Sequence, residues 1–228
     1  MFFFGGAGCS CESGIPDFCS SNGLFSKKLN RRFTPEQLVS HTFFMHYPDD
    51  FFSFYKESLI YPNAQPNECH KALAKLEKMG KLKAIVTQNI DGLHQVAGSQ
   101  HVYELHGSVL RNYCMKCNTF YDVDYILRTD GVPTCSKCGG VVKPDVVLYE
   151  EGLDDQVVAG AIRSISNADI LIIGGTSLVV YPAAGLIDYF RGKQLVLINK
   201  GTTAADKRAN LLFNDNIASV MKEAVEHI

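Results

Sequence analysis

Hydrophobic residues along this chain fall into short continuous runs that alternate with stretches in which apolar residues recur at helical spacing. The continuous runs predict buried strands, and the helical spacing predicts amphipathic helices. Strands are expected at residues 2–8, 83–90, 143–149, 169–175 and 194–200, and helices at 67–80, 153–168 and 183–190. Alternation of apolar strands with helices is typical of a parallel sheet that is covered on both faces.

Residues 34–60 are rich in Phe and Tyr and also show helical spacing. Pro35 follows Thr34, an arrangement that predicts a helix start, and Pro48 predicts a break. In the next helix, Asn67 is a candidate N-cap and Gly80 a stop signal.

Length and composition favour one folded domain with an insertion. The chain has 228 residues, 46% hydrophobic and 20% charged, with a net charge of −2. The absence of a long basic run argues against a nucleic-acid partner. The most apolar stretch, 168–187, is interrupted by Gly and Pro, so no membrane span is expected. The start of the chain lacks the basic region of an export signal, and we expect a cytoplasmic protein.

Four of the eight cysteines form two Cys-x-x-Cys pairs separated by 17 residues: Cys114 with Cys117, and Cys135 with Cys138. This spacing predicts one zinc ion held by four thiolates, a closed shell whose role is structural. The alternatives are metal-free knuckles, a redox pair, or a nucleic-acid-binding zinc ribbon; nearby aspartates disfavour the last of these.

In parallel sheets, ligands bind at the carboxyl ends of the strands. The first predicted strand ends in "GGAG", where Gly6 and Gly8 would let a phosphate approach backbone N–H groups. A dinucleotide-binding fingerprint would have its third glycine at position 11, which is Cys11 here. A tight structural turn is therefore an equally good interpretation.

Polar residues follow other predicted strands. In "TQNIDGLH", the amide and carboxylate groups of Gln88, Asn89 and Asp91 suit a ribose or a carboxamide, or they cap the next helix. In "GGTSL", Thr176 and Ser177 suit phosphate or ribose, or an N-cap. His106 in "ELHGS" is a candidate general base, although a lone histidine is more often structural.

Taken together, several stretches resemble the sirtuins, a family of NAD-dependent protein deacylases. They are "GAGCSCESGIPDF", "TQNIDGLH", "ELHGS", the four cysteines, "KPDVVLYEE", "GGTSLVVYPA" and "LINK", in the family's order. The resemblance implies an α/β fold with a Rossmann-like NAD-binding domain (1–30, 81–108 and 143–228). It also implies a small domain made of a helical insertion (31–80) and a zinc ribbon (109–142).

The resemblance also implies roles for individual residues. His106 matches the catalytic histidine, and Asn89 is assigned to catalysis with it. Val147 and Tyr149 match the segment that pairs with the substrate peptide. The implied NAD-binding residues are Gly6, Ala7, Gly8, Cys11, Phe18, Cys19, Gln88, Ile90, Asp91, Thr176, Ser177, Asn199, Lys200 and Asp215.

The implied reaction removes an acyl group, with acetyl expected, from lysines of a protein or peptide substrate. It consumes NAD and gives nicotinamide and 2′-O-acyl-ADP-ribose. We expect a monomer with one structural zinc and neither a nucleic-acid nor a membrane partner. Two alternatives remain open: a protein mono-ADP-ribosyltransferase, and a sensor that binds NAD or acyl peptide with weak catalysis.

The sequence departs from the family at Cys19 and at Cys9 and Cys11, and a further pair of residues bears on the acyl group. Cys19 stands where most relatives have arginine, so we expect weaker NAD binding. Cys9 and Cys11 replace an aliphatic and a small residue, and are interpreted as packing rather than redox groups. Phe52 and Tyr55 stand where relatives that prefer acidic acyl groups carry Tyr and Arg, so a non-acidic acyl group is expected.

Overall fold

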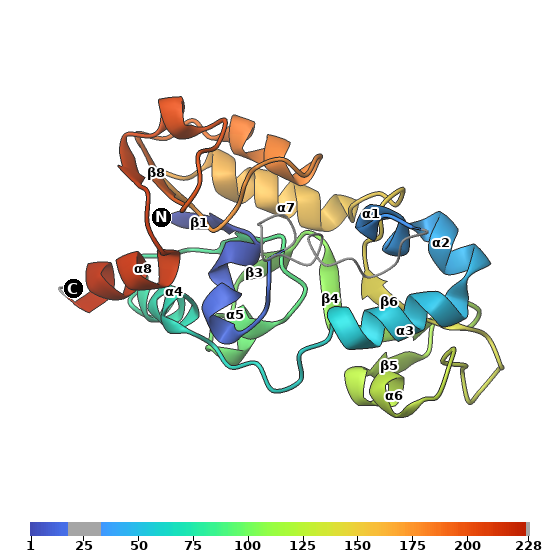
Figure 1. The fold of residues 1–228 in the computed structure, drawn as a ribbon. Helices are drawn as coiled ribbons and strands as arrows, with labels where there is room; N and C mark the ends of the chain where they lie inside the picture. Colours follow the sequence, from blue (N-terminus) through green and yellow to red (C-terminus); the bar gives the residue numbers. More distant parts are fainter. Residues whose placement is uncertain (18–32, 227–228) are drawn as a thin grey trace.

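The computed structural model describes residues 1–17 and 33–226. Its larger part (Figure 1) is built on a six-stranded sheet, whose strand order is β3-β2-β1-β7-β8-β9. Every neighbouring pair in this sheet is parallel. The strands are β1 (Phe2–Gly5), β2 (Ile85–Thr87), β3 (Val102–Glu104), β7 (Ile170–Gly174), β8 (Gln194–Ile198) and β9 (Leu211–Phe213).

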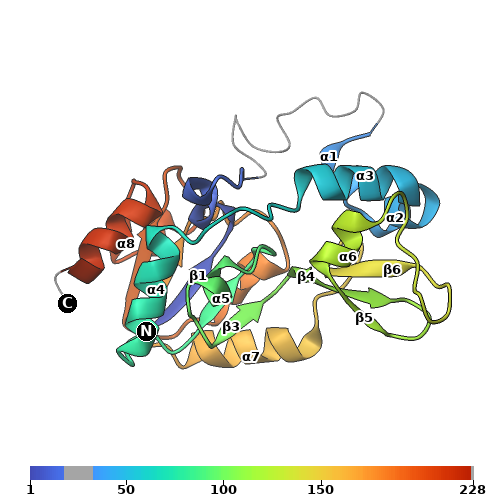
Figure 2. The same cartoon turned by 90° about the horizontal axis from the view of Figure 1, so that it is seen from below.

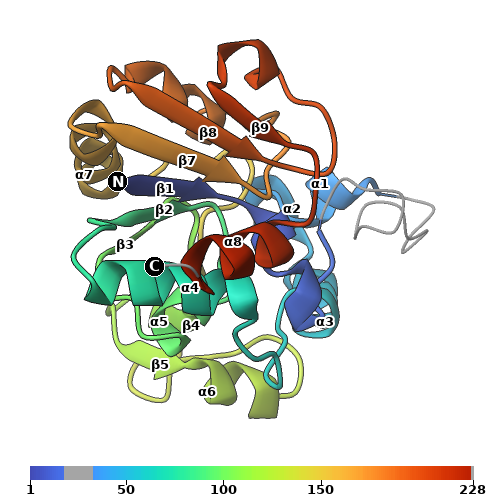
Figure 3. The same ribbon diagram turned by 90° about the vertical axis from the view of Figure 1, so that its left-hand side faces the viewer.

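Helices cover both faces of this sheet, as Figure 3 shows with the strands seen in order from β3 to β9. One face packs against α7 (Asp155–Ser166) and the 3-10 segment η4 (Ala183–Tyr189), around Phe4 and Leu171. The other face packs against α4 (Glu68–Lys78) and α8 (Ile217–Glu226), around Phe3 and Leu73. Burial on both faces explains why the central strands are continuously apolar.

A smaller part lies beside the large sheet (Figure 2). It contains a three-stranded antiparallel sheet in the order β5-β4-β6. These strands are β4 (Gly107–Cys114), β5 (Phe120–Asp122) and β6 (Val142–Val146). The helices of this part are α1 (Pro35–Leu38), α2 (His41–His46), α3 (Pro48–Ser58) and α6 (Val123–Arg128). A separate hydrophobic core, rich in aromatic side chains from α2 and α3, holds the small part together.

The predicted helix starts are confirmed in detail. Thr34 accepts a hydrogen bond from the backbone of Gln37, and the Gln37 side chain bonds back to Thr34, which makes a capping box. Asn67 caps α4 in the same way with His70 as its partner. The break at Pro48 separates α2 from α3.

Other elements differ from the sequence predictions. The helix expected at 183–190 is a 3-10 segment that contains Gly185, a residue that disfavours the interior of a regular α-helix. The strand expected at 143–149 ends at Val146 and pairs antiparallel with β4. Strands β3, β4, β5 and β9 were not predicted. The division into domains by residue range stays a prediction.

The remaining elements are short. They are the 3-10 turns η1 (Ala7–Cys9), η2 (Cys11–Ser13) and η5 (Asp206–Arg208), and the single helical turn α5 (Leu93–Val96). No helix in the described ranges is both long and apolar enough to cross a membrane.

Candidate active site

Most of the predicted site residues that the structure describes follow the carboxyl ends of the parallel strands, at one edge of the large sheet. Gly6, Ala7 and Gly8 follow β1, Gln88–Asp91 follow β2, and His106 follows β3. Thr176 and Ser177 follow β7, Asn199 and Lys200 follow β8, and Asp215 follows β9. Because carboxyl ends of parallel strands meet at one edge, residues that are distant in the sequence are brought together there.

The glycines after β1 are explained first by close packing. A Cβ atom on Gly8 would lie 2.7 Å from the Cα of Gly175, and one on Gly6 would lie 2.8 Å from the Cβ of Thr176. The N–H groups of Gly6 and Gly8 donate to the carbonyls of Gly174 and Gly175. Among the hydrogen bonds of the described residues, the Ala7 N–H has no partner, so it is the amide of this turn that remains available to an anion.

Ser10 is the centre of a hydrogen-bonded cluster that the sequence did not reveal. Its hydroxyl donates to Oδ2 of Asp91 at 2.6 Å and accepts from Nδ2 of Asn89 at 3.0 Å. The other carboxylate oxygen of Asp91 accepts from the Leu93 N–H, at the start of α5. Asp91 therefore binds the first N–H of α5 and takes part in the Ser10 cluster at the same time, while its predicted role toward a ribose stays a prediction.

His70 completes the cluster from α4. Its Nδ1 accepts from the Asn67 N–H, so the proton of a neutral ring is on Nε2, which lies 3.4 Å from the Ser10 hydroxyl oxygen. Burial lowers the pKa of His70 to about 4, which keeps the ring neutral. The fully buried His94 lies beside it, with ring centroids 4.8 Å apart, and burial lowers the pKa of His94 to about 3.

Gln88 and Thr176 connect the ends of β2 and β7. The Gln88 amide donates to the Thr176 hydroxyl at 3.0 Å, and the same oxygen accepts from the Leu178 N–H at 3.2 Å. The next helical segment begins at Ala183 after Pro182, so the N-cap alternative for Thr176 and Ser177 is wrong.

His106 is held through one of its two ring nitrogens, Nδ1, which leaves Nε2 without this contact. Its Nδ1 lies 2.9 Å from the Gln88 carbonyl oxygen. A carbonyl can only accept, so Nδ1 carries the proton and the lone pair of the neutral ring is on Nε2. Burial lowers the pKa of His106 below 6.5, and the hydrogen bond to Gln88 offsets this only in part. A neutral imidazole with a free Nε2 can act as a general base.

The residues expected around the adenosine half lie at the ends of β8 and β9. The Asn199 N–H donates to the Phe213 carbonyl, and its side-chain amide donates to the Gly201 carbonyl. The charge of Lys200 lowers the pKa of the Cys11 thiol, an effect smaller than the opposite effect of burial. Asp215 accepts from the Asn216 N–H.

The four predicted zinc ligands form one cluster in the small sheet. The sulfur atoms of Cys114, Cys117, Cys135 and Cys138 all lie within 4.8 Å of one another. Tyr121 stabilises the cluster by donating its hydroxyl proton to the Cys135 sulfur at 3.2 Å. Four thiols at this separation fit a tetrahedral Zn²⁺ ion with no open position, so these residues would hold zinc in a structural role.

The segment after β6 is hydrogen bonded to the junction between α1 and α2. The Tyr149 N–H donates to the Val39 carbonyl, and the Tyr149 carbonyl accepts from the His41 N–H. The Val147 N–H donates to the His106 carbonyl at 3.1 Å. In the hydrogen bonds of the described residues, the Val147 carbonyl is without a partner. A bound peptide would therefore meet one open acceptor here instead of a continuous strand edge.

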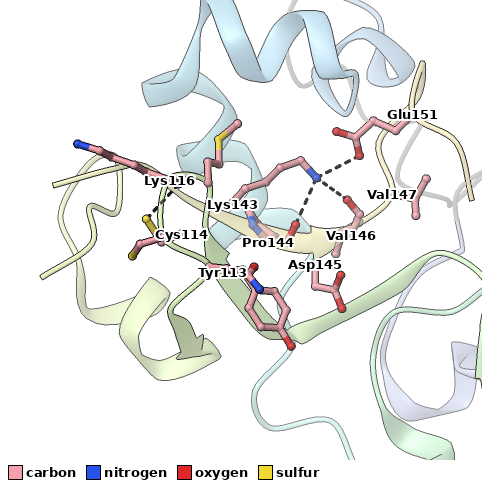
Figure 4. A pocket seen from close by; sticks show the side chains of 12 residues that line it. Tyr113, Cys114, Lys116, Lys143, Pro144, Asp145, Val146, Val147 and Glu151 are labelled. Carbon is pink, nitrogen blue, oxygen red and sulfur yellow. Dashed lines mark hydrogen bonds and ion pairs between the residues drawn. The ribbon is translucent and has the colours of Figure 1, made fainter. Parts of the chain in front are cut away.

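A cavity of about 530 Å³ lies between the first cysteine knuckle and the segment after β6 (Figure 4). Lys143 crosses it, donating to the Val146 carbonyl and to the Glu151 carboxylate. The cavity shares Val147 with the predicted peptide segment but is not lined by His106.

The departures from the family pattern have different outcomes. Cys9 is buried in the core, as its packing interpretation predicts. Cys11 is exposed, so its packing interpretation is wrong. Desolvation and the charge of Asp17 nevertheless raise the pKa of its thiol, which disfavours a reactive thiolate. Phe52 and Tyr55 are fully buried. Phe18 and Cys19 lie outside the described residues.

Comparisons with known proteins identify the family. The sequence matches the Sir2 family over residues 6–182. It is 71% identical over 227 residues to an NAD-dependent protein deacetylase of Clostridium perfringens, covering 99% of this chain and 93% of that protein. The chain belongs to the Sir2 family. A second Sir2 relative, the NAD-dependent protein deacetylase of Staphylococcus aureus strain Mu50, is 45% identical over 221 residues, covering 96% of this chain and 90% of that protein.

Solved Sir2 structures share the fold. One, with a deacetylated p53 peptide and 3′-O-acetyl-ADP-ribose, has a TM-score of 0.90 and 38% identity, covering 99% of this chain and 92% of that one. Another, bound to a propionylated peptide, has a TM-score of 0.86 and 38% identity with the same coverage. Membership of the Sir2 family confirms the predicted fold class, a parallel sheet domain with a small domain that contains the cysteine cluster.

Proposed function

We propose that this chain removes acyl groups, acetyl above all, from protein lysines in a reaction that consumes NAD. The observation that carries the proposal is the orientation of His106. Its Nδ1 proton is donated to Gln88, which leaves Nε2 free at the strand edge where the Ser10–Asn89–Asp91 cluster lies. A neutral base beside polar groups suited to a ribose is what this reaction requires.

The proposed roles of the residues follow from their contacts. NAD is a substrate, and its ribose would lie between Asp91, Asn89 and His106, with its phosphates near the Ala7 N–H. The acyl oxygen of the lysine attacks the anomeric carbon, the bond to nicotinamide breaks, and an alkylimidate forms. Nε2 of His106 then takes the proton of a ribose hydroxyl, so that the 2′-oxygen can attack the imidate carbon. Water completes the release of lysine and 2′-O-acyl-ADP-ribose.

The peptide is proposed to bind along Val147 and Tyr149. The Val147 carbonyl, left without a partner among the described residues, would accept the N–H of the acylated side chain. Glu151 holds this segment in place, because its carboxylate accepts from the Leu148 N–H at 2.9 Å and pairs with His41 at 2.9 Å and Lys143 at 3.1 Å. A neutral amide is a weak nucleophile, so fixed placement of both reactants supplies much of the rate enhancement.

The finer parts of the proposal rest on chemistry of the chain. One zinc ion held by the four cysteines requires reduced thiols, which favours the cytoplasm as the place of action. A non-acidic acyl group is favoured because Lys56, the cation beside Phe52, donates to the carbonyls of Thr129 and Gly131 instead of facing a ligand. The chain is proposed to act as a monomer on acylated proteins.

The test is mass spectrometry of an acetyl-lysine peptide incubated with the protein, with and without NAD. The proposal expects loss of the acetyl group and formation of 2′-O-acetyl-ADP-ribose only with NAD. His106→Ala should abolish both, and His46→Ala, which changes a histidine bonded to the Thr42 carbonyl on α2, should leave both unchanged. ADP-ribose attached to a protein acceptor would point to a transferase, and NAD binding without turnover would point to a sensor.

A further inference from the structure

His106 lies at a joint between the two sheets. Strand β3 of the large sheet ends at Glu104, and β4 of the small sheet begins at Gly107. Only Leu105 and His106 connect them. Leu105 is fixed in the core, with 1% exposure and its N–H bonded to the Thr87 carbonyl. A rotation of one sheet against the other would therefore change the backbone conformation at His106.

Arg111 spans this joint. Its Nη1 lies 2.7 Å from Oε2 of Glu104, and its Nε lies 2.8 Å from Oδ2 of Asp145. Glu104 belongs to the large sheet, whereas Arg111 and Asp145 belong to neighbouring strands of the small sheet. Of the two ion pairs, only the one with Glu104 crosses from one sheet to the other. We call Arg111, Glu104 and Asp145 the Arg111 clamp.

The two carboxylates of the Arg111 clamp lie close in sequence to residues that the proposed reaction uses. Glu104 stands two residues before His106, and Asp145 stands two residues before Val147. The Val147 N–H and the His106 carbonyl are themselves hydrogen bonded. Gly107 fits tightly into this arrangement: its φ is +73°, and a Cβ there would lie 1.9 Å from the Asp145 carbonyl oxygen. The backbone around His106 is thus packed closely on the side of the small sheet.

The energetics favour a geometric role for the clamp. The guanidinium side chain is 37% exposed, and ion pairs of that exposure add little to folding stability. The Glu104 side chain, by contrast, is only 9% exposed, so its direction is well defined. A planar guanidinium that binds two carboxylates fixes their mutual orientation, which a lysine cannot do.

We propose that Arg111 is a positioning residue for the Sir2 reaction: through Glu104 and Asp145 it fixes the angle between the two sheets, and with it the placement of His106 and of the Val147 segment. This inference rests on the proposed function. Arg111 touches neither reactant, and it acts by holding the groups that do. Small displacements of reacting groups can cost up to about 100-fold in rate.

The experiment compares Arg111→Gln, Glu104→Gln and Asp145→Asn with the wild type. The matched control is Arg208→Gln, which breaks an arginine–carboxylate pair with Asp188 inside the large part of the molecule. We expect kcat for deacetylation to fall about tenfold in Arg111→Gln and Glu104→Gln. KM for NAD should stay within about twofold, because the proposed NAD-binding residues lie at the large sheet. Asp145→Asn should have a smaller effect and Arg208→Gln none.

A readout besides activity is the titration of the His106 imidazole, followed by NMR in the folded protein and assigned by its loss in His106→Ala. The proposal expects this pKa to rise toward 6.5 in Arg111→Gln and Glu104→Gln, because a loosened joint admits water. An unchanged titration in both variants would overturn the inference, as would an unchanged kcat. A wild-type chain that does not deacetylate would instead overturn the proposed function, and the NMR titration would still decide whether the clamp holds His106.

Discussion

The Ser10 hydroxyl donates a hydrogen bond of 2.6 Å to the Asp91 carboxylate, across 81 residues of sequence. The same hydroxyl oxygen accepts from Asn89, and the His70 Nε2 lies 3.4 Å away. Because its single proton is donated to Asp91, the Ser10 hydroxyl can only accept further hydrogen bonds. Ser10 therefore fixes two polar side chains of the proposed ribose site at once.

Replacing Ser10 by alanine tests this role. Ser10→Ala removes a hydrogen bond to a charged group, which typically costs about 1.5–3 kcal/mol. We expect kcat/KM for NAD to fall by about 10- to 150-fold, measured by steady-state kinetics with an acetylated peptide. Ser219→Ala, on the exposed face of α8, is the control. An unchanged kcat/KM would mean that Asp91 and Asn89 need no support from Ser10.

The pH dependence of the reaction should follow His106. Its base form is neutral, and burial lowers its pKa below 6.5. Activity should thus be retained into mildly acidic solution and should fall only as the pH drops through this lowered pKa. The measurement is kcat/KM for the acetylated peptide as a function of pH. An acidic limb with its midpoint above 6.5 would contradict the environment described for this ring.

The buried histidine pair should make stability depend on pH. The pKa values of His70 and His94 are lowered by burial to about 4 and about 3. Below pH 6.5 the unfolded chain binds protons that the folded chain does not, so stability falls as the pH decreases toward the folded pKa values. Each histidine contributes a slope of up to about 1.4 kcal/mol per pH unit.

Urea unfolding between pH 4.5 and 7 measures this slope. In His94→Phe the slope should decrease by about one proton, because the substituted ring does not titrate. His46→Phe changes an exposed histidine on α2 that bonds to a backbone carbonyl, and it serves as the control. Equal slopes in the wild type and His94→Phe would show that His94 is not the group responsible.

Removing zinc should destabilise the small sheet. The four cysteines lie in the segments before β5 and after α6. A shared zinc ion would bind these two segments together, and without it the four sulfur atoms do not attract one another strongly. A loss of about 3 kcal/mol would lower Tm by about 6–12 °C in a chain of this size. Calorimetry with and without a chelator, and after zinc is added back, provides the measurement. Cys117→Ser should behave like the chelated wild type, and an unaltered Tm in both would exclude a structural ion.

Much of the fold could be predicted because its signals are local. Thr34 and Pro35 start α1, Asn67 starts α4 and Gly80 ends it, each through contacts within a few residues. The cysteine spacing indicated a metal cluster for the same reason. Strand β9 was missed because its three residues, Leu211–Phe213, are all exposed and show no alternation. Their strand conformation comes from pairing with β8.

The site itself was only partly legible in the sequence. Asn89, Asp91 and His106 could be chosen because each stands in a polar run after a strand. Ser10 and His70 could not, because their partners lie 60 or more residues away and only the sheet brings them together. One signal was available for His70. It is the third residue of the helix that Asn67 caps, and it lies on the buried face of that helix.

Strand β4 begins beside the imidazole of residue 106 and ends at a zinc-binding sulfur, since its eight residues run from Gly107 to Cys114. The two places are joined by a strand whose register with β6 shifts between Ser108 and Asn112, and in which only Asn112 and Tyr113 pair with both neighbouring strands. Cys117 at the far end is exposed. An electrophile that captured this thiol would remove one of the four predicted zinc ligands, so we expect it to destabilise the small sheet at the end remote from residue 106.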